Sequence, residues 1–245
     1  GLLDNIAGPI SCLGASMNSL NLAHPPNDNS VNGREVEIRG VIKSGEPRVL
    51  TNIYREDTNI VIWQRKLSGT LRQAVDGFLK ANTNFETSMT VTPQSALLSV
   101  SEALGDTDQS ELSENITELV DMFCCLFEIK RAGLRLAILD RAMCPKFHAD
   151  KVPCRLVTTF QGVATEWLPH QAVNRSKLGV GSQGKPDHES GLYQNHHDIQ
   201  QLNCGDVGLL KGELWEGNEN AGLVHRSPSL PDSERRLLLT LDFSH

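Results

Sequence analysis

The pattern of apolar and polar residues divides the chain into a helix-rich stretch followed by a β-rich stretch. From 110 to 131, apolar residues recur at every third or fourth position, which predicts a helix with one buried face that ends at Gly133. Two further helix starts lie upstream, one at Ser68 or Thr70 and one at Thr92, which precedes a proline. A hydroxyl at these positions can accept a hydrogen bond from a free backbone N–H of the first turn.

Short apolar or alternating segments bounded by glycine, proline and asparagine are typical of β-strands. Two of them precede the long helix, at 58–64 and 85–91, and one follows it directly, at 134–140. The remaining segments lie at 155–160, 163–168, 199–202, 207–210, 223–227 and 236–243. Short strands at such regular intervals predict a sandwich or barrel in the second half of the chain.

The fold class that we predict is α+β. Residues 1–50 carry little pattern and are expected to form an N-terminal arm. Residues 51–245 are expected to form one domain, in which helices within 68–131 support a β core at 134–243. The long polar segment at 174–198 is either a lid over a pocket or a solvated insertion, since loops of that length are usually functional or disordered.

The strand at 236–243 separates an apolar face from a mixed one, because successive side chains of a strand point to opposite faces. Its odd positions are Leu237, Leu239, Leu241 and Phe243, and we expect them to pack against the helices. Arg236 lies on the other face with Thr240 and Asp242, whereas Arg235 begins the apolar side. A pocket on the mixed face would contain Arg236, so we favour Arg236 as the cofactor-binding residue, with Arg235 as the second candidate. The guanidinium of Arg236 could bind a carboxylate through two parallel hydrogen bonds.

The candidate chemistry lies at His148, Asp150 and His225. His148 and Asp150 are two positions apart, so in an extended segment their side chains leave the same face and can bind one ion. His225 would complete the set. Two imidazoles and one carboxylate leave coordination positions open for a cosubstrate and dioxygen, as in non-haem Fe(II) sites, although such a set also binds Zn, Ni or Mn.

Six cysteines are too few for a disulfide scaffold in 245 residues, and none forms a CxxC pair, so we expect mostly reduced thiols. Cys144 and Cys154 flank His148 and Asp150 at equal distances along the chain. The two thiols could bind zinc, or they could be small half-buried residues beside the pocket.

The composition argues against some classes of partner. A net charge of −7 and the lack of any run of basic residues disfavour nucleic-acid binding. No stretch of eighteen apolar residues occurs, and the first residues lack the basic start and apolar core of a signal peptide. We therefore expect no membrane partner and a soluble, cytoplasmic protein.

The order of the polar residues carries a family resemblance. His148-x-Asp150, then His225, then Arg236 after ten intervening residues, closing on Arg-Leu-Leu-Leu-Thr-Leu, resembles the signature of the Fe(II)/2-oxoglutarate-dependent oxygenase superfamily. The resemblance covers residues 134–243 and implies a C-terminal double-stranded β-helix, or jelly roll. The same half of the chain is also similar to a family of uncharacterised bacterial proteins known only as a domain of unknown function.

The resemblance implies a hydroxylase-type oxygenase that uses Fe(II) and 2-oxoglutarate. His148, Asp150 and His225 would then be the catalytic metal ligands, and Arg236 would pair with the distal carboxylate of 2-oxoglutarate. Arg175 is a candidate for a second basic residue at the cosubstrate. The sequence does not indicate the oligomeric state. It also does not indicate the substrate, which could be a small molecule or a protein.

Two other classes of protein fit the same sequence. The first is a cupin-like barrel that binds a metal without 2-oxoglutarate, with Glu166 as a further ligand. The second is a degenerate barrel that serves as a binding module, with the helix at 110–131 as its interface. Other catalytic patterns are absent from the sequence, which has no GxSxG elbow, no phosphate-binding glycine loop with lysine and no HExxH motif.

Overall fold

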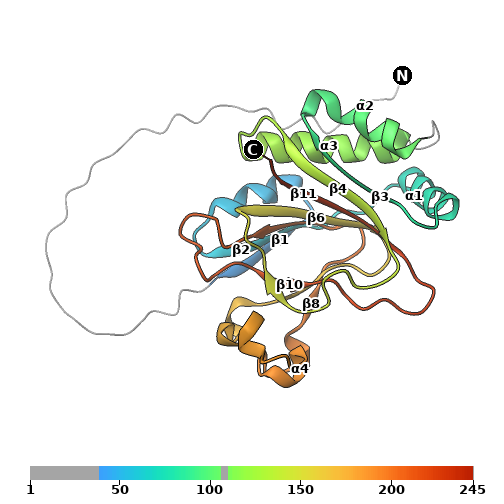
Figure 1. The fold of residues 1–245 in the computed structure, drawn as a ribbon. Helices are drawn as coiled ribbons and strands as arrows, with labels where there is room; N and C mark the ends of the chain where they lie inside the picture. Colours follow the sequence, from blue (N-terminus) through green and yellow to red (C-terminus); the bar gives the residue numbers. More distant parts are fainter. Residues whose placement is uncertain (1–38, 106–109, 245) are drawn as a thin grey trace, which may run out of the picture. The chain divides into compact units, whose positions relative to one another are not determined.

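The computed structural model describes residues 39–105 and 110–244, which form a mixed α/β fold with a large and a small sheet (Figure 1). The strands are β1 (Gly40–Ser44), β2 (Thr58–Trp63), β3 (Glu86–Val91), β4 (Ala132–Leu139), β5 (His148–Ala149), β6 (Cys154–Gln161), β7 (Glu166–Leu168), β8 (Gln200–Gln201), β9 (Val207–Lys211), β10 (Val224–Arg226) and β11 (Arg236–Phe243). The α-helices are α1 (Gly69–Ala81), α2 (Pro93–Leu104), α3 (Ser110–Leu126) and α4 (Asp187–Ser190). The 3-10 helices are η1 (Pro47–Tyr54), η3 (His170–Ala172), η4 (Arg175–Lys177), η5 (Gly179–Ser182) and η6 (His196–Asp198). Within these residues no helix is both long and apolar enough to cross a lipid bilayer.

The large sheet has seven strands in the order β1-β2-β9-β6-β11-β4-β3, and the small sheet has four in the order β5-β10-β7-β8. Neighbouring strands are antiparallel except for β1 and β2, which are parallel. From β4 onward the chain passes repeatedly from one sheet to the other. Strands that are distant in the sequence, such as β6 and β11, therefore lie side by side.

The helix starts that the sequence indicated at hydroxyl groups are confirmed. Ser68 begins α1, where its side chain accepts a hydrogen bond from the backbone N–H of Leu71. Thr92 begins α2, where its side chain accepts from the backbone N–H of Ser95. The same helix ends at Gly105, whose φ of 76° lies in the left-handed region that glycine adopts without strain.

The long helix α3 ends earlier than the sequence pattern indicated. Its last residue is Leu126, and Gly133, which we expected to terminate it, belongs to β4. The backbone of Glu128 has a φ of 53°, and the N–H of Ile129 donates to the carbonyl of Cys124. A non-glycine residue in the left-handed conformation thus ends the helix, and such a stop leaves no glycine in the sequence.

Part of the predicted N-terminal arm belongs to the large sheet. Strand β1 pairs with β2 at the sheet edge, and η1 contributes Val49, Leu50 and Ile53 to the core. None of the five residues of β1 is fully buried, so its sequence lacks a clear apolar face. The remainder of the arm, residues 1–38, lies outside the described residues.

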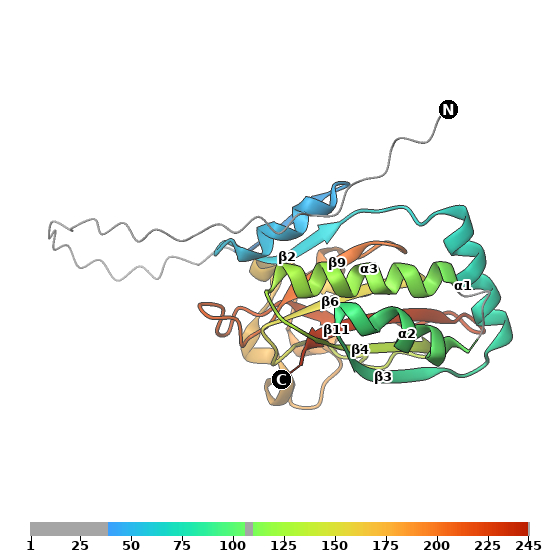
Figure 2. The same cartoon turned by 90° about the horizontal axis from the view of Figure 1, so that it is seen from above.

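One face of the large sheet carries the main apolar core. Leu237, Leu239 and Leu241 of β11 are fully buried there together with Phe78 of α1 and Ile116 of α3. Figure 2 shows α2 and α3 lying across β6, β11 and β4. The expectation that the odd positions of the last strand pack on the helices is therefore confirmed. The apolar stripe of α3 faces this core rather than solvent.

The opposite face of the large sheet looks toward the small sheet. Val157 of β6, Leu210 of β9 and Leu238 of β11 form a second apolar cluster with Trp167 of β7 and with Leu223. This cluster fills part of the space between the two sheets. Polar residues of the same strands lie beside it and line the cavity described below.

The segment at 174–198 packs on the outer face of the small sheet. Phe147 and Val224 form an apolar cluster there with Leu192 of the segment. Asp187 accepts a hydrogen bond from the backbone N–H of Phe147 at 2.9 Å. Figure 1 shows α4 on the side of β10 and β8 that faces away from α2 and α3. The segment is therefore attached to the sheet through these residues, while most of its other residues are exposed or half-buried.

Candidate metal centre

Strand pairing in the small sheet brings the three predicted ligands together. His148 of β5 and His225 of β10 are direct partners across the antiparallel pair, and their ring centroids are 4.7 Å apart. Asp150 directly follows β5. Its Oδ1 lies 3.5 Å from Nε2 of His148, and its Oδ2 lies 3.4 Å from Nε2 of His225. One ligand atom from each of the three residues lies within 4.8 Å of the others, so that a single cation can contact all three.

Backbone carbonyls orient both imidazoles. Nδ1 of His148 is 2.9 Å from the carbonyl oxygen of Lys146, and Nδ1 of His225 is 3.1 Å from that of Leu223. Because a carbonyl oxygen can only accept, Nδ1 of each ring carries the proton in these hydrogen bonds. Nε2 of each ring is then the atom that faces Asp150, where it can donate a hydrogen bond to the carboxylate or, once deprotonated, bind a cation.

The surroundings of Asp150 keep its carboxyl group ionised. Burial alone would raise the pKa of Asp150, but hydrogen bonds with His148 and His225, and the charge of Arg155, hold the pKa well below its usual range. The neighbouring Asp150 raises the pKa of His148 in turn. The site therefore offers an anionic oxygen at neutral pH, as binding of a divalent cation requires.

The imidazoles open into a cavity between the two sheets. Its lining comes mainly from β6, β10 and β11 and from the loop before β5, and consists of Met143, Cys144, His148, Arg155, Val157, Thr165, Leu210, His225, Arg226, Ser227, Arg236, Leu238 and Thr240. No residue of the segment at 174–198 belongs to this lining.

Arg236 is the most deeply buried charged residue of the cavity, with 1% of its surface exposed. Its Nη atoms form only long hydrogen bonds of 3.4 Å, to the hydroxyls of Ser227, Thr159 and Thr165. Its Nε atom is buried without a partner, and no carboxylate pairs with the guanidinium among the residues that the structure describes. Burial lowers the pKa of Arg236 to about 10, which leaves the group charged at neutral pH.

The two other arginines that we singled out lie elsewhere. Arg235 points to the opposite side of β11, where its guanidinium donates to the backbone carbonyls of Leu79 and Asn82 at the end of α1. Arg175 donates to the carbonyl of Gly222 and does not line the cavity. Arg235 lies away from the cavity because successive side chains of a strand point to opposite faces. Arg175 lies away from it because the 174–198 segment is attached to the outer side of the small sheet.

The alternative ligands from the sequence do not join the site. Glu166 accepts a hydrogen bond from Nε of Arg226 at 2.6 Å and is outside the ligand cluster. Cys144 is exposed and Cys154 is completely buried, and both are free thiols. In the described part of the chain, His148, Asp150 and His225 form a cluster of potential metal ligands, and neither cysteine is part of it.

Arg155 contacts the site but was not selected from the sequence. Its Nη1 donates to Oδ2 of Asp150 at 2.7 Å, while its Nε and Nη2 donate to the two carboxylate oxygens of Asp242 at 2.9 and 3.0 Å. The only signal in the sequence was that Arg155 and Asp242 occupy strands. Their pairing depends on the register of β6 with β11, which the sequence alone does not reveal.

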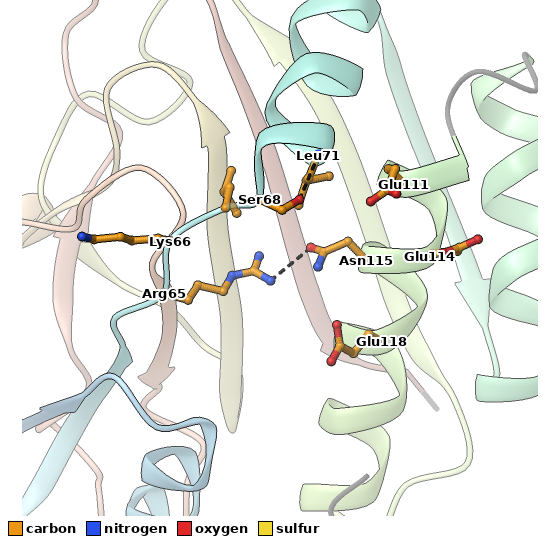
Figure 3. Close-up of a pocket in the computed structure, with 9 residues that line it drawn as sticks. Arg65, Lys66, Ser68, Leu71, Glu111, Glu114, Asn115 and Glu118 are labelled. Carbon is orange, nitrogen blue, oxygen red and sulfur yellow. Dashed lines mark hydrogen bonds between the residues drawn. The ribbon is translucent and has the colours of Figure 1, made fainter. Parts of the chain in front are cut away.

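A second cavity, of about 250 Å³, lies between the start of α1 and α3 (Figure 3). Figure 3 shows the guanidinium of Arg65 reaching Asn115 of α3, with Glu111, Glu114 and Glu118 along the same helix. The cavity contains no histidine or cysteine, and its carboxylates form no metal-binding cluster. We therefore assign the chemistry to the histidine site rather than to this larger cavity.

A family model described as "Protein of unknown function (DUF1826)" matches residues 44–242. No curated protein has a matching sequence. Among solved structures, the chain is similar to the 2-oxoglutarate complex of dioxygenase for auxin oxidation 1 from Arabidopsis thaliana, with 9% identity and a TM-score of 0.46 over 84% of this chain and 92% of that chain. A dioxygenase for auxin oxidation in rice gives 9% identity and a TM-score of 0.47, with 84% and 82% covered. An oxidoreductase of the 2OG-Fe(II) oxygenase family from Burkholderia pseudomallei gives 12% and 0.41, with 85% and 95% covered.

Proposed function

The chain belongs to the DUF1826 family, and we propose that it is a non-haem Fe(II)/2-oxoglutarate-dependent oxygenase of the hydroxylase type. One observation carries the proposal. A site of two histidines and one carboxylate shares a cavity with a buried guanidinium that lacks a carboxylate partner among the described residues. The first feature fits a divalent cation, and the second fits an anionic cosubstrate.

The strand order supports a double-stranded β-helix as the finer description of the fold. Of the eight strands from β4 to β11, the large sheet contains β4, β6, β9 and β11, and the small sheet contains β5, β7, β8 and β10. In each sheet the later strand lies between two earlier ones, β11 between β4 and β6, and β10 between β5 and β7. Two antiparallel sheets wound in this way make a jelly roll. The remaining strands, β1, β2 and β3, would extend the large sheet at its two edges.

The donor set supports Fe(II) as the bound metal. Two neutral imidazole nitrogens and one carboxylate oxygen on one side of a cation leave the other positions open, which is the arrangement that non-haem Fe(II) oxygenases use. Each imidazole is oriented by a backbone carbonyl, as expected of a metal ligand. Ligand type alone does not select iron, and Zn or Ni would bind to the same three residues.

Arg236 supports 2-oxoglutarate as the cosubstrate. A buried guanidinium without a counter-ion is destabilising, because it has lost its hydration and gained no charged partner. A carboxylate in the cavity would supply that partner through two parallel hydrogen bonds. A dicarboxylate with a keto group next to one end can bind Arg236 at one end and a metal at the other, and 2-oxoglutarate has this structure.

Each group of the chain then has a defined task. His148, Asp150 and His225 hold the metal, Arg236 orients the cosubstrate, and the apolar residues Val157 and Leu238 of the cavity exclude water. Bound Fe(II) would supply the activation of dioxygen. The substrate would approach from the side of Met143, which is 44% exposed at the cavity.

The test is an anaerobic titration of the purified chain, without a histidine tag, with Fe(II) in the presence and absence of 2-oxoglutarate. Chelation of the keto acid by bound iron gives a weak visible charge-transfer band, which we expect only when both are present. The variant His225→Ala should lose Fe(II) binding and the band. The matched control is His188→Ala, because His188 is an exposed histidine outside the site, and it should behave as the original chain.

Two outcomes would contradict the proposal in different ways. Lack of Fe(II) binding by the folded chain would contradict the metal site and favour a binding module without metal. Iron binding without the band would contradict the use of 2-oxoglutarate and favour the cupin-like alternative.

A further inference from the structure

We propose that Arg155 is a positioning residue for the metal ligand Asp150 and that Asp242 acts on the metal site through Arg155. The inference rests on the proposed function, since it concerns the same metal. Asp242 is the penultimate residue of β11 and makes no contact with the histidines, so its influence on the site would pass through one guanidinium.

The strand pairing fixes the position of Arg155. Arg155 and Asp242 are direct partners in the antiparallel pair of β6 and β11. The fork of Nε and Nη2 matches the two oxygens of the Asp242 carboxylate at 2.9 and 3.0 Å. This bidentate contact holds the planar guanidinium in one orientation, in which Nη1 remains available for a third carboxylate oxygen.

That third oxygen belongs to Asp150. Nη1 of Arg155 donates to Oδ2 of Asp150 at 2.7 Å, the shortest contact of the ligand carboxylate with another side chain. Asp150 needs such support because it follows a strand of only two residues and its carboxylate could otherwise rotate. With Oδ2 held by Arg155, the carboxylate is fixed in the orientation in which Oδ1 faces His148 and Oδ2 faces His225.

The charge of Asp242 also affects the electrostatics of the metal site. A guanidinium beside a divalent cation would by itself weaken metal binding by electrostatic repulsion. Asp242 offsets the charge of Arg155, so that Arg155 can orient Asp150 without this penalty. With the charge of Arg155 offset in this way, the negative charge of Asp150 remains available to the cation beside the two imidazoles.

The experiment measures Fe(II) affinity under anaerobic conditions together with the melting temperature of the metal-free chain. Arg155→Met should lower Fe(II) affinity by about 10- to 100-fold, the usual effect of removing a group that orients a metal ligand. Arg155→Lys retains the charge but cannot bind both carboxylates in the same way, and should fall between Arg155→Met and the original chain. Asp242→Asn is the milder variant, should the Arg155 variants fold poorly, and should show a smaller loss.

The double variant tests whether Asp242 acts through Arg155. If it does, Asp242→Asn lowers Fe(II) affinity in the original chain but adds no further loss in the Arg155→Met background. The matched control is Arg135→Met, which breaks an arginine–glutamate pair with Glu86 in the same sheet but outside the cavity. It should leave Fe(II) affinity unchanged.

The outcomes separate this inference from the proposed function. If Arg155→Met and Asp242→Asn change the melting temperature but not the Fe(II) affinity, Arg155 only joins β6 to β11 and the inference is overturned. Additive losses in the double variant would overturn the action of Asp242 through Arg155. If the original chain binds no Fe(II), both the proposed function and this inference fall together.

Discussion

The two faces of the large sheet are built from the same strands but bury different groups. Toward the helices, β11 presents Leu237, Leu239 and Leu241, all completely buried in the main core. Toward the small sheet, the same strand presents Leu238 and also Arg236, which is almost as deeply buried but carries a charge without a carboxylate partner among the described residues. One face therefore stabilises the fold, whereas the other includes a group that destabilises it.

This difference indicates where binding takes place. Burial of an apolar side chain contributes about 1.5–3 kcal/mol, whereas an uncompensated buried charge costs several kcal/mol. A stable apolar face can offset such a cost on the opposite face. Because the charge of Arg236 does nothing for the free fold, its burial is best explained by a ligand that supplies the missing partner.

The largest expected effect comes from the helix side. Leu239→Ala should lower the free energy of unfolding by about 2–5 kcal/mol, because it removes a completely buried side chain and leaves a cavity. Chemical denaturation of the metal-free chain measures this loss. Leu214→Ala, at a residue that is 64% exposed, is the control and should change stability by less than about 0.5 kcal/mol.

The Fe(II) affinity of the Leu239→Ala variant tests whether the helix-facing side of the sheet affects metal binding. At a temperature where the variant is folded, its affinity should match that of the original chain, since Leu239 contacts none of the metal ligands. A large loss of affinity in the folded variant would show that the two faces are coupled and that stability and binding are not divided between them.

The second effect comes from the cavity side and has the opposite sign for stability. Arg236→Met should leave the free energy of unfolding unchanged or raise it by about 1 kcal/mol or more, because an unpaired buried charge is replaced by an apolar side chain of similar length. Affinity for 2-oxoglutarate in the presence of Fe(II) should fall by roughly tenfold to hundredfold, since hydrogen bonds to charged groups contribute about 1.5–3 kcal/mol.

Denaturation without ligand measures the effect of Arg236→Met on stability. Titration of the visible band with 2-oxoglutarate measures its effect on cosubstrate affinity. Arg236→Lys keeps the charge without the planar fork and should recover only part of the affinity. Unchanged affinity for 2-oxoglutarate in Arg236→Met, with iron still bound, would contradict the role of Arg236 while leaving the metal site intact.

Features that depend on the spacing of residues within one helix or strand could be predicted from the sequence. Alternation along 236–243 separated Arg236 from the odd-numbered residues that pack on the helices. The two-residue spacing of His148 and Asp150 placed their side chains near one ion site. The helix starts at Ser68 and Thr92 also followed from local chemistry, because a capping hydroxyl acts within a single turn.

Features that depend on pairing between distant segments could not be predicted. Arg155 and Asp242 are 87 positions apart in the sequence, and their contact requires the register of β6 with β11. The assignment of β1 to the sheet required its parallel pairing with β2, since its own residues lack a buried face. The 174–198 segment packs on the outer face of the small sheet, and its polar composition did not indicate this packing.

The smallest expected effect concerns Arg235, the neighbour of Arg236 on the other face. Arg235→Ala should lower the free energy of unfolding by about 1 kcal/mol, because it removes hydrogen bonds to the carbonyls of Leu79 and Asn82 at the end of α1 and a positive charge at a helix C-terminus. Affinity for 2-oxoglutarate should not change. Denaturation and titration of Arg235→Ala and Arg236→Ala side by side make the comparison direct. A loss of 2-oxoglutarate affinity in Arg235→Ala as large as that in Arg236→Ala would mean that adjacent residues on opposite faces serve one site, and the division of the sheet into a stabilising and a binding face would then be wrong.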